Sequence, residues 1–304
     1  MSQQKFEVPE TAAGQTAAAF VRGSVGQLTW SEVRRHIQAR RVIVNGVICI
    51  DEARRLRAGD VVEFLKESAK PAPKLRDVSV VYEDQSLVVI EKPAGMICER
   101  RPEERKWSRQ LKDQTTTVQE ALQASGVEAL PVHRLDRDTS GLMVYAKTPA
   151  AQAGLVRLFA KHQIERRYLA VALGRVEAST VKTWIVRDRG DGLRGSVAAP
   201  HPDAEEAISH IAVREHLGDD YTILECRLET GRTHQIRIHL AEMKHPICGE
   251  KLYLKPMTDP SGAPRQALHC CRLGFVHPGT GKPIEFESDW PADLKWWMDA
   301  LRGK

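Results

Sequence analysis

The sequence lacks the features that mark membrane and secreted proteins. It contains no run of the roughly 20 apolar residues that a membrane helix needs, so no membrane contact is expected. Its first residues show neither the charged segment nor the apolar stretch of a signal peptide. Its 6 cysteines form no C-x-x-C pair, and the adjacent Cys270 and Cys271 are badly placed to bond to each other. Free thiols in a reducing cytoplasm are therefore predicted.

Motifs of several common enzyme classes are also missing. There is no Walker A sequence and no dinucleotide fingerprint, so no nucleotide cofactor is indicated. Ser140 is not framed by the G-x-S-x-G elbow of many serine hydrolases. The histidines and cysteines between residues 234 and 271 match neither H-E-x-x-H nor a paired C-x-x-C spacing. The sequence therefore predicts no cofactor and no metal.

What the sequence does contain is a basic N-terminal segment. The whole chain of 304 residues has a net charge of only +5, and residues 31–57 hold seven arginines against three acidic residues. About +4 of the charge thus falls in one short segment, which is either a solvated helix face or a phosphate-binding surface. The concentration of charge favours the second interpretation, as does the use of arginine, which suits bidentate phosphate contacts. The candidate contact residues are Arg34, Arg35 and Arg41.

Turn and linker signals predict a small domain followed by a large one. Residues 1–14 are expected to be a flexible tail, and residues 15–69 a small α/β domain. Thr29 and Glu32 form a capping box that opens a short helix. An Asn-Gly turn then joins two strands within residues 42–48, and a closing strand follows at 61–64.

The alternating prolines of residues 70–76 predict a linker to a second domain over residues 77–304. Mostly short strands, a few helices and no regular βαβ alternation indicate an α+β fold with a mixed, mostly antiparallel sheet. Strands are expected at 78–82, 87–91, 142–146, 168–173, 208–214, 222–228 and 283–287. Helices are expected at 117–124, 150–161, 233–243 and 292–301.

A dense polar run, His133–Gly141, leads directly into one of the predicted buried strands. A loop that feeds such a strand is held rigidly, which suits a functional site. Asp138 and the three residues after it have an ordinary turn composition. Asp136 differs, because Arg134 and Arg137 flank it and favour the ionised form that a nucleophile or base requires. Spacing alone supports a functional role and a surface ion pair equally.

A second polar cluster occupies residues 230–247. Its apolar residues fit a strand by alternation, but Ile236, Leu240 and Met243 also follow a helical spacing, and Thr233 can serve as N-cap. A helix is therefore favoured. Arg237 would lie away from its apolar stripe, free to reach a carboxylate or a phosphate.

Taken in order along the chain, these stretches resemble the motifs of the RluA-type RNA pseudouridine synthases, over nearly the whole sequence. Residues 133–147 match the signature H-R-L-D-x-x-T-S-G-L. The other matching stretches are Lys92-Pro93-Ala94-Gly95, Arg167-Tyr168-Leu169-Ala170, residues 230–237, Leu268-His269 and residues 277–281. Residues 15–66 resemble an S4 RNA-binding domain.

The resemblance implies isomerisation of uridine in structured RNA without a cofactor. The C1'–N1 bond is broken, the uracil turns, and it is reattached through C5. Asp136 would be the catalytic carboxylate, acting by attack on C1' or through a glycal intermediate. Tyr168 would stack on the uracil and help with loss of the C5 proton, and Arg237 would pair with Asp136 and keep it charged.

Other implied roles concern binding. Arg134 would fill the gap left in the RNA by the flipped uridine, and Ile236 would line the pocket floor or merely pack. Large-subunit ribosomal RNA is the implied substrate, with transfer RNA as an alternative. A non-catalytic RNA-binding or ribosome-assembly protein on the same fold is a further alternative. A monomer without an obligate protein partner is expected. Glu250 departs from the family pattern, in which Asp is common at this place.

Overall fold

The computed structural model describes residues 4–26, 28–45, 47–69, 77–100, 102, 104–107, 112, 115–197, 202–254 and 256–303. The chain divides into two compact units, one formed by Met1–Ala72 with Trp107–Gln114, the other by Pro73–Lys106 with Thr115–Lys304. The linker predicted at residues 70–76 lies outside the described residues. Within the described part, no helix is long and apolar enough to span a bilayer.

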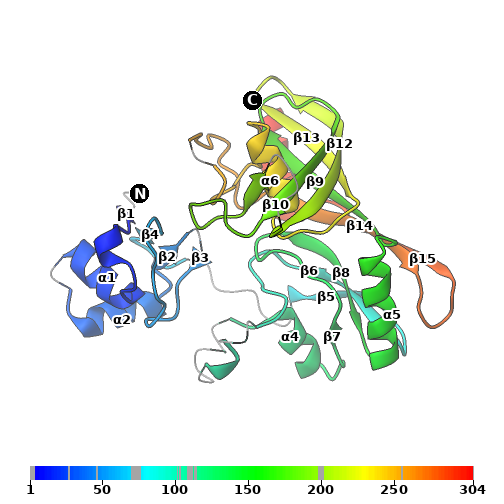
Figure 1. Ribbon diagram of the computed structural model, residues 1–304, viewed down its shortest axis with the longest axis horizontal. Coiled ribbons are helices and arrows are strands. Elements are labelled where there is room, and N and C mark those ends of the chain that lie inside the picture. Colours follow the sequence, from blue (N-terminus) through cyan, green and yellow to red (C-terminus); the bar gives the residue numbers. More distant parts are fainter. Residues whose placement is uncertain are drawn as a thin grey trace. The chain divides into compact units, whose positions relative to one another are not determined.

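The N-terminal unit combines two helices with a four-stranded antiparallel sheet of order β1-β4-β2-β3 (Figure 1). Its elements are β1 (Gln4–Glu7), η1 (Glu10–Ala12), α1 (Ala17–Val25), α2 (Trp30–Gln38), β2 (Val42–Val44), β3 (Val47–Ile48) and β4 (Val61–Phe64). The predicted capping box is confirmed, because the Thr29 hydroxyl and the Glu32 carboxylate each accept a hydrogen bond from the other residue's backbone N–H. Val33 and Ile37 of the same helix are buried in the core of this unit.

The prediction of a flexible tail over residues 1–14 is wrong from residue 4 onward. Strand β1 pairs with β4 from Gln4 opposite Phe64 to Glu7 opposite Val61. Val8 is buried in the core of the unit and Phe6 packs against that core. An edge strand needs an apolar side chain only at every second position, so the polar composition of this segment concealed it.

The larger unit is built on one eleven-stranded sheet. Nine of its strands follow the order β11-β10-β12-β13-β9-β14-β8-β6-β5, and the other two, β15 and β7, pair with β14 and β8. Its strands are β5 (Ser79–Glu83), β6 (Leu87–Lys92), β7 (Leu130–Pro131), β8 (Ser140–Ala146), β9 (Glu165–Leu173), β10 (Ser179–Val186), β11 (Gly195–Val197), β12 (Ala204–Leu217), β13 (Tyr221–Leu228), β14 (Leu268–Val276) and β15 (Pro283–Glu287). Strands β8 and β14 run parallel, and the other described pairings of this sheet are antiparallel. The predicted α+β class with a mostly antiparallel sheet is confirmed.

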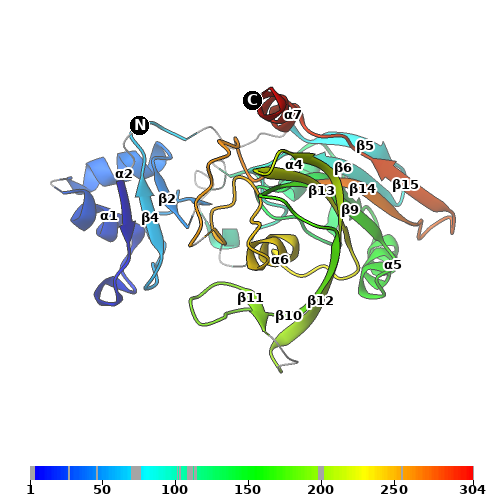
Figure 2. The ribbon, with the colours of Figure 1, turned by 90° about the horizontal axis from the view of Figure 1, so that it is seen from above.

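The helices of this unit are η3 (Glu104–Lys106), α4 (Val118–Ala124), α5 (Pro149–Ala160), α6 (Gln235–Glu242) and α7 (Ala292–Arg302). Each of the four α-helices lies close to its predicted range. Figures 1 and 2 show α5 along β8 and α6 against β12, and these pairs are in contact. Strands β7, β10, β11 and β14 were not predicted.

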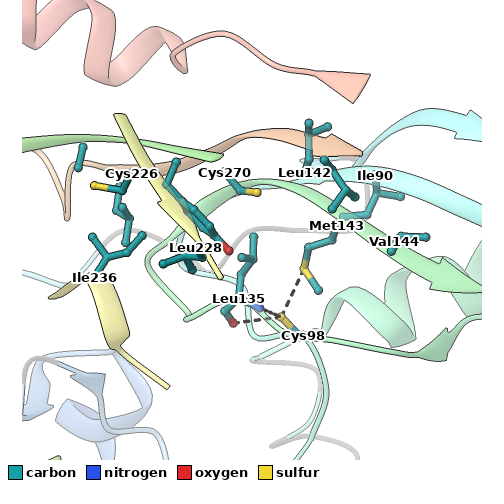
Figure 3. Packing of buried hydrophobic residues seen from close by; sticks show 14 of the residues in the cluster. Ile90, Cys98, Leu135, Leu142, Met143, Val144, Cys226, Leu228, Ile236 and Cys270 are labelled. Atoms are coloured by element: carbon teal, nitrogen blue, oxygen red, sulfur yellow. Dashed lines mark hydrogen bonds between the residues drawn. The ribbon is translucent and has the colours of Figure 1, made fainter. Parts of the chain in front are cut away.

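The core under the sheet fixes the loop that precedes β8. Every residue of β8 is buried. Leu135 packs there beside Met143, and the Cys98 thiol accepts a hydrogen bond from Leu135 N at 3.3 Å and donates one to Leu135 O at 3.2 Å (Figure 3). All 6 cysteines are free, as predicted. Leu135, the residue before Asp136, is therefore held at both its backbone N–H and its carbonyl group.

Candidate active site

The two polar clusters singled out in the sequence meet at Asp136. The Arg237 guanidinium donates a hydrogen bond from Nη1 to Asp136 Oδ2 at 3.2 Å, across 101 residues of sequence. His234 Nε2 lies 3.8 Å from the other carboxylate oxygen, Oδ1. The Asp136 side chain is 17% exposed and lines a small cavity of about 60 Å³. One carboxylate thus combines limited solvent access with a cation at fixed geometry.

Arg237 is itself held by a second acid, Glu250. The pair is bidentate, with Nε–Oε2 and Nη2–Oε1 distances of 2.8 Å each, and the Glu250 side chain is fully buried. Burial alone would raise the pKa of Glu250, but the hydrogen bonds and charge of Arg237 outweigh it and lower that pKa to about 2. Arg237 is therefore buried and bound to two carboxylates, and one of these is Asp136, the partner that the resemblance implied.

A ring of hydrogen bonds closes on the loop that carries Asp136. Gln266 donates from Nε2 to Glu250 Oε2 at 2.9 Å. The Thr139 hydroxyl donates to Gln266 Oε1 at 3.2 Å. Thr139 and Asp136 belong to the same loop, so the ring runs from that loop through Arg237, Glu250 and Gln266 and back to it. Such a closed, buried network fixes the carboxylate more firmly than a single ion pair could.

Helix α6 begins in a strained conformation beside the site. Its N-cap is His234, with a left-handed φ of 63° and no side-chain cap, so the prediction that Thr233 caps the helix is wrong. His234 Nδ1 lies 2.7 Å from the Tyr253 hydroxyl. The strain is offset by placing the imidazole between Tyr253 and Asp136. Burial lowers the pKa of His234 to about 4, which leaves the ring neutral at pH 7.

The other expected site residues line the same cavity. Tyr168 of β9 and Ile236 of α6 are buried there, whereas Arg134 is exposed at its rim. Burial raises the pKa of Tyr168 well above its usual value, so the hydroxyl stays protonated. In the part of the chain that the structure describes, no three His, Cys, Asp or Glu side chains gather as a metal site. The cavity therefore combines a fixed carboxylate, a phenol, an apolar wall and a cation at its mouth.

The sequence is similar to those of known proteins. Residues 86–242 match the family described as RNA pseudouridylate synthase. The chain belongs to this family. It is 35% identical to the ribosomal large subunit pseudouridine synthase D of Xanthomonas campestris, over 99% of this chain and 93% of that protein. It is 32% identical to an uncharacterized RNA pseudouridine synthase, YlyB, of Bacillus subtilis, over 99% of both chains.

The fold agrees with a solved member. Human RNA pseudouridylate synthase domain containing 4 is 22% identical and superposes with a TM-score of 0.58, covering 74% of this chain and 93% of that one. This likeness concerns the fold alone. The family membership makes the protein an isomerase that converts uridine in RNA to pseudouridine, as the sequence predicted.

Sequence reasoning missed several groups that support the site of this pseudouridine synthase. Lys92 is fully buried, and its ammonium donates hydrogen bonds to the carbonyl oxygens of Pro93, Met96 and Arg137 at 2.7 to 2.9 Å. It thereby ties the residue after Asp136 to the end of β6. Lys92 was recognised only as part of a motif, because nothing in the sequence shows which carbonyl groups an ammonium will reach.

The basic residues of the N-terminal unit fall into two groups. Arg34 and Arg35 lie on the exposed face of α2, paired with Glu52 at 2.9 Å and loosely with Glu32 at 3.9 Å. Arg41 is instead bonded inside the unit, to Leu65 O at 2.9 Å and to the His36 ring at 3.1 Å. Arg34 and Arg35 are thus available to a ligand, whereas Arg41 has a structural task.

Proposed function

We propose that this synthase isomerises uridines of large-subunit ribosomal RNA in the cytoplasm, with Asp136 as its reacting carboxylate. The relatives named for this substrate are similar over nearly the full chain. The observation that carries the assignment of Asp136 is its position, between Arg237 and His234 in the cavity that Tyr168 lines. The proposed active form is a monomer without an obligate protein partner.

The two carboxylate oxygens of Asp136 have different surroundings. Oδ2 accepts the hydrogen bond from Arg237, and Oδ1 faces His234 across 3.8 Å. We assign the His234 proton to Nε2, because a lone pair directed at a carboxylate would be repelled; Nδ1 then accepts from the Tyr253 hydroxyl. Arg237 and the neutral imidazole together orient the carboxylate, and Oδ1, which is not hydrogen-bonded to Arg237, is the atom that reacts with the ribose.

Tyr168 provides a ring face on which the uracil stacks. Because its phenol is neutral, it can donate a hydrogen bond to the base but is poorly suited to remove the C5 proton directly. Arg134, exposed at the rim, occupies the gap that the flipped uridine leaves in the RNA. Ile236 forms the apolar floor of the cavity.

Replacing the reacting carboxylate tests this assignment. Asp136→Asn is expected to abolish pseudouridine formation while RNA affinity changes little, because the amide keeps the shape and loses the nucleophilic oxygen. Asp138→Asn is the matched control, since it alters a carboxylate two residues further along the same loop and should keep activity. Tritium release from RNA labelled with [5-³H]uridine measures both. Full activity in Asp136→Asn would contradict the assignment, as would equal losses in both variants.

The N-terminal unit is proposed to act as an S4-like RNA-binding module. Its support is the concentration of arginines in residues 31–57 and the exposed pair Arg34 and Arg35 on α2. Phosphate contacts from such residues supply affinity without reading sequence. Pseudouridine mapping in ribosomal and transfer RNA, from cells with and without the gene, identifies the substrate. Loss of sites only in transfer RNA would overturn the ribosomal assignment.

A further inference from the structure

One charge in the catalytic cavity has no counter-charge. Arg166 of β9 lines this cavity and is only 7% exposed. Among the residues that the structure describes, no acidic side chain forms an ion pair with it, and its buried Nε has no hydrogen-bond partner. Its one hydrogen bond is long, from Nη2 to Glu229 O at 3.5 Å. A buried cation without a partner is costly and is rarely kept without a function.

The neighbouring arginines show how unusual this is. Arg167, the next residue, faces the other side of the sheet and pairs with Glu165 and Glu225. Arg237, in the same cavity, has two acidic partners. Arg166 instead lies over the Phe159 ring at 5.5 Å. It also approaches Gly231 so closely that a Cβ at that position would clash with its Nη1. A ring contact does not satisfy the donors, so the guanidinium is arranged for a ligand that arrives from solution.

The reaction produces such a ligand. When the C1'–N1 bond breaks, the electron pair of the bond stays with the uracil, which leaves as an anion with its charge shared by N1, O2 and O4. The carboxylate of Asp136 bonds to C1' or takes up a ribose proton. When C5 then bonds to C1', the carboxylate is regenerated, the C5 proton passes to water, and N1 takes up a proton, so that the pseudouridine base is neutral. The charge on the base exists only between these two steps.

Arg166 is placed to meet that charge. It precedes Tyr168 by two residues, so the two side chains project from the same face of β9, roughly 7 Å apart along the strand. A uracil stacked on Tyr168 would therefore lie beside the guanidinium. A phosphate of the RNA backbone is a poorer match, because Arg166 lies in the buried wall of the cavity, whereas Arg134 is exposed at its rim.

We propose that Arg166 is a catalytic residue that donates hydrogen bonds to a carbonyl oxygen of the departing uracil and stabilises its negative charge. This inference rests on the proposed function. A preorganised, desolvated cation acts mostly on the transition state, where the charge develops, and little on the binding of neutral uridine.

The test compares Arg166→Gln, Arg166→Lys and the wild type as full-length proteins, on [5-³H]uridine-labelled RNA from cells that lack the gene. Arg166→Gln should slow the single-turnover rate roughly 10²- to 10³-fold, the range for loss of one such donor, with RNA affinity nearly unchanged. Arg166→Lys should recover part of the rate because it restores the charge. Arg166→Gln should also raise the melting temperature, because it removes an unpaired buried charge.

Arg167→Gln is the matched control. The same substitution one residue further along breaks two ion pairs, so it should lower the melting temperature and leave the single-turnover rate unchanged. An unchanged rate in Arg166→Gln would overturn the proposal. So would weaker RNA binding at an unchanged rate, which would indicate a phosphate contact, or a lower melting temperature, which would indicate a structural role. If the wild type released no tritium from any RNA, the function itself would be wrong.

Discussion

At the scale of single residues, the guanidinium of Arg237 binds two carboxylates, one more tightly than the other. Arg237 makes two hydrogen bonds of 2.8 Å to Glu250 and a single one of 3.2 Å to Asp136. Glu250 also accepts the backbone N–H groups of Lys251 and Leu252, which secures its own position. The tighter contact fixes where the guanidinium lies, and the looser one leaves Asp136 oriented yet able to react.

Replacing Glu250 should therefore damage both stability and catalysis. Glu250→Gln leaves a buried guanidinium short of a partner and is expected to lower the free energy of unfolding by about 3 kcal/mol. The guanidinium would also shift towards Asp136. We expect kcat to fall roughly tenfold as a result, which corresponds to about 1.4 kcal/mol of transition-state stabilisation. Urea unfolding and single-turnover kinetics measure the two effects. Glu250→Asp, which keeps the charge, should recover most of the activity, and the interpretation fails if it is no better than Glu250→Gln.

The sequence predicted the pair of Asp136 and Arg237 but not what surrounds it. Motifs named both residues, and their contact is present. Glu250 lies 13 residues beyond Arg237 and showed only a departure from a familiar pattern. Helical periodicity indicates the face on which Arg237 lies, but not whether a later loop will close over that face. Arg166 was overlooked for the same reason, since an unpaired buried charge is a property of three-dimensional packing.

At the scale of elements, the parallel contact between β8 and β14 positions the loop that carries Asp136. Ser140 lies opposite His269 and Gly141 opposite Cys270. Gly141 adopts a φ of 113°, and a Cβ there would collide with the backbone of Cys270. The close approach brings β14 against the end of the loop that holds Asp136, so a residue without a side chain is required at this one position.

Gly141→Ala is expected to destabilise the protein by more than about 3 kcal/mol, because the added methyl meets backbone rather than a movable side chain. Gly190→Ala is the control, since Gly190 has a similar φ of 110° with open space around its Cα. Strain alone should cost that variant about 1 kcal/mol. Denaturant midpoints of the two variants separate the close approach from the φ effect. Equal losses would show that the contact with Cys270 is unimportant.

Most strands and helices could be predicted, and the two longest of the missed strands, β14 and β10, have identifiable reasons. Strand β14 contains an irregularity between Cys270 and Arg272, which shifts the alternation of its side chains and breaks the expected period of two. Half of the residues of strand β10 are polar, and only Ile185 and Val186 are buried, so the strand shows no clear apolar face. Periodicity reveals strands whose side chains alternate regularly and whose apolar residues share one face, and neither β14 nor β10 meets both conditions.

At the scale of the whole molecule, several buried or half-buried histidines are neutral at pH 7. Burial lowers the pKa of His133 to about 3, and those of His234, His239 and His269 to about 4. In the unfolded chain each would bind a proton below pH 6.5, so unfolding takes up protons as the pH falls from 6.5 to 4. Stability should therefore decrease with acidity in that window.

The free energy of unfolding is expected to drop by about 6 kcal/mol between pH 6.5 and pH 5, since each of the four rings contributes up to about 1.4 kcal/mol per pH unit. Urea unfolding at pH 7, 6 and 5 measures this. Glu250 acts in a separate window, because its lowered pKa costs stability only below about pH 4.5. His239→Asn should flatten the slope between pH 6.5 and 5. A stability that does not change over this range would contradict the neutral state of these rings.

We also expect arginines of the N-terminal unit, and not those of the larger unit, to contribute to the salt dependence of RNA affinity. Replacing Arg34 and Arg35 together with glutamine is expected to reduce the slope of log affinity against log salt by about 1.5 to 2, as two phosphate contacts are lost. The control replaces Arg175 and Arg302, two arginines of the larger unit with acidic neighbours, and should leave the slope unchanged. Binding titrations between 50 and 200 mM salt serve as the measurement. An identical slope in both double variants would remove the support for an RNA-binding N-terminal unit.

The position of β14 between β9 and β8 sets the time at which the enzyme can first act. Asp136 precedes β8 and Tyr168 lies on β9, yet the strand that joins them in the sheet comes about a hundred residues later. While the chain is still being made, at about 5–20 residues per second, the two halves of the sheet have nothing between them. Synthesis must therefore proceed through Val276 before the loop that carries Asp136 and the strand that carries Tyr168 can be joined in one sheet, so a nascent chain that stops short of β14 is expected to be inactive.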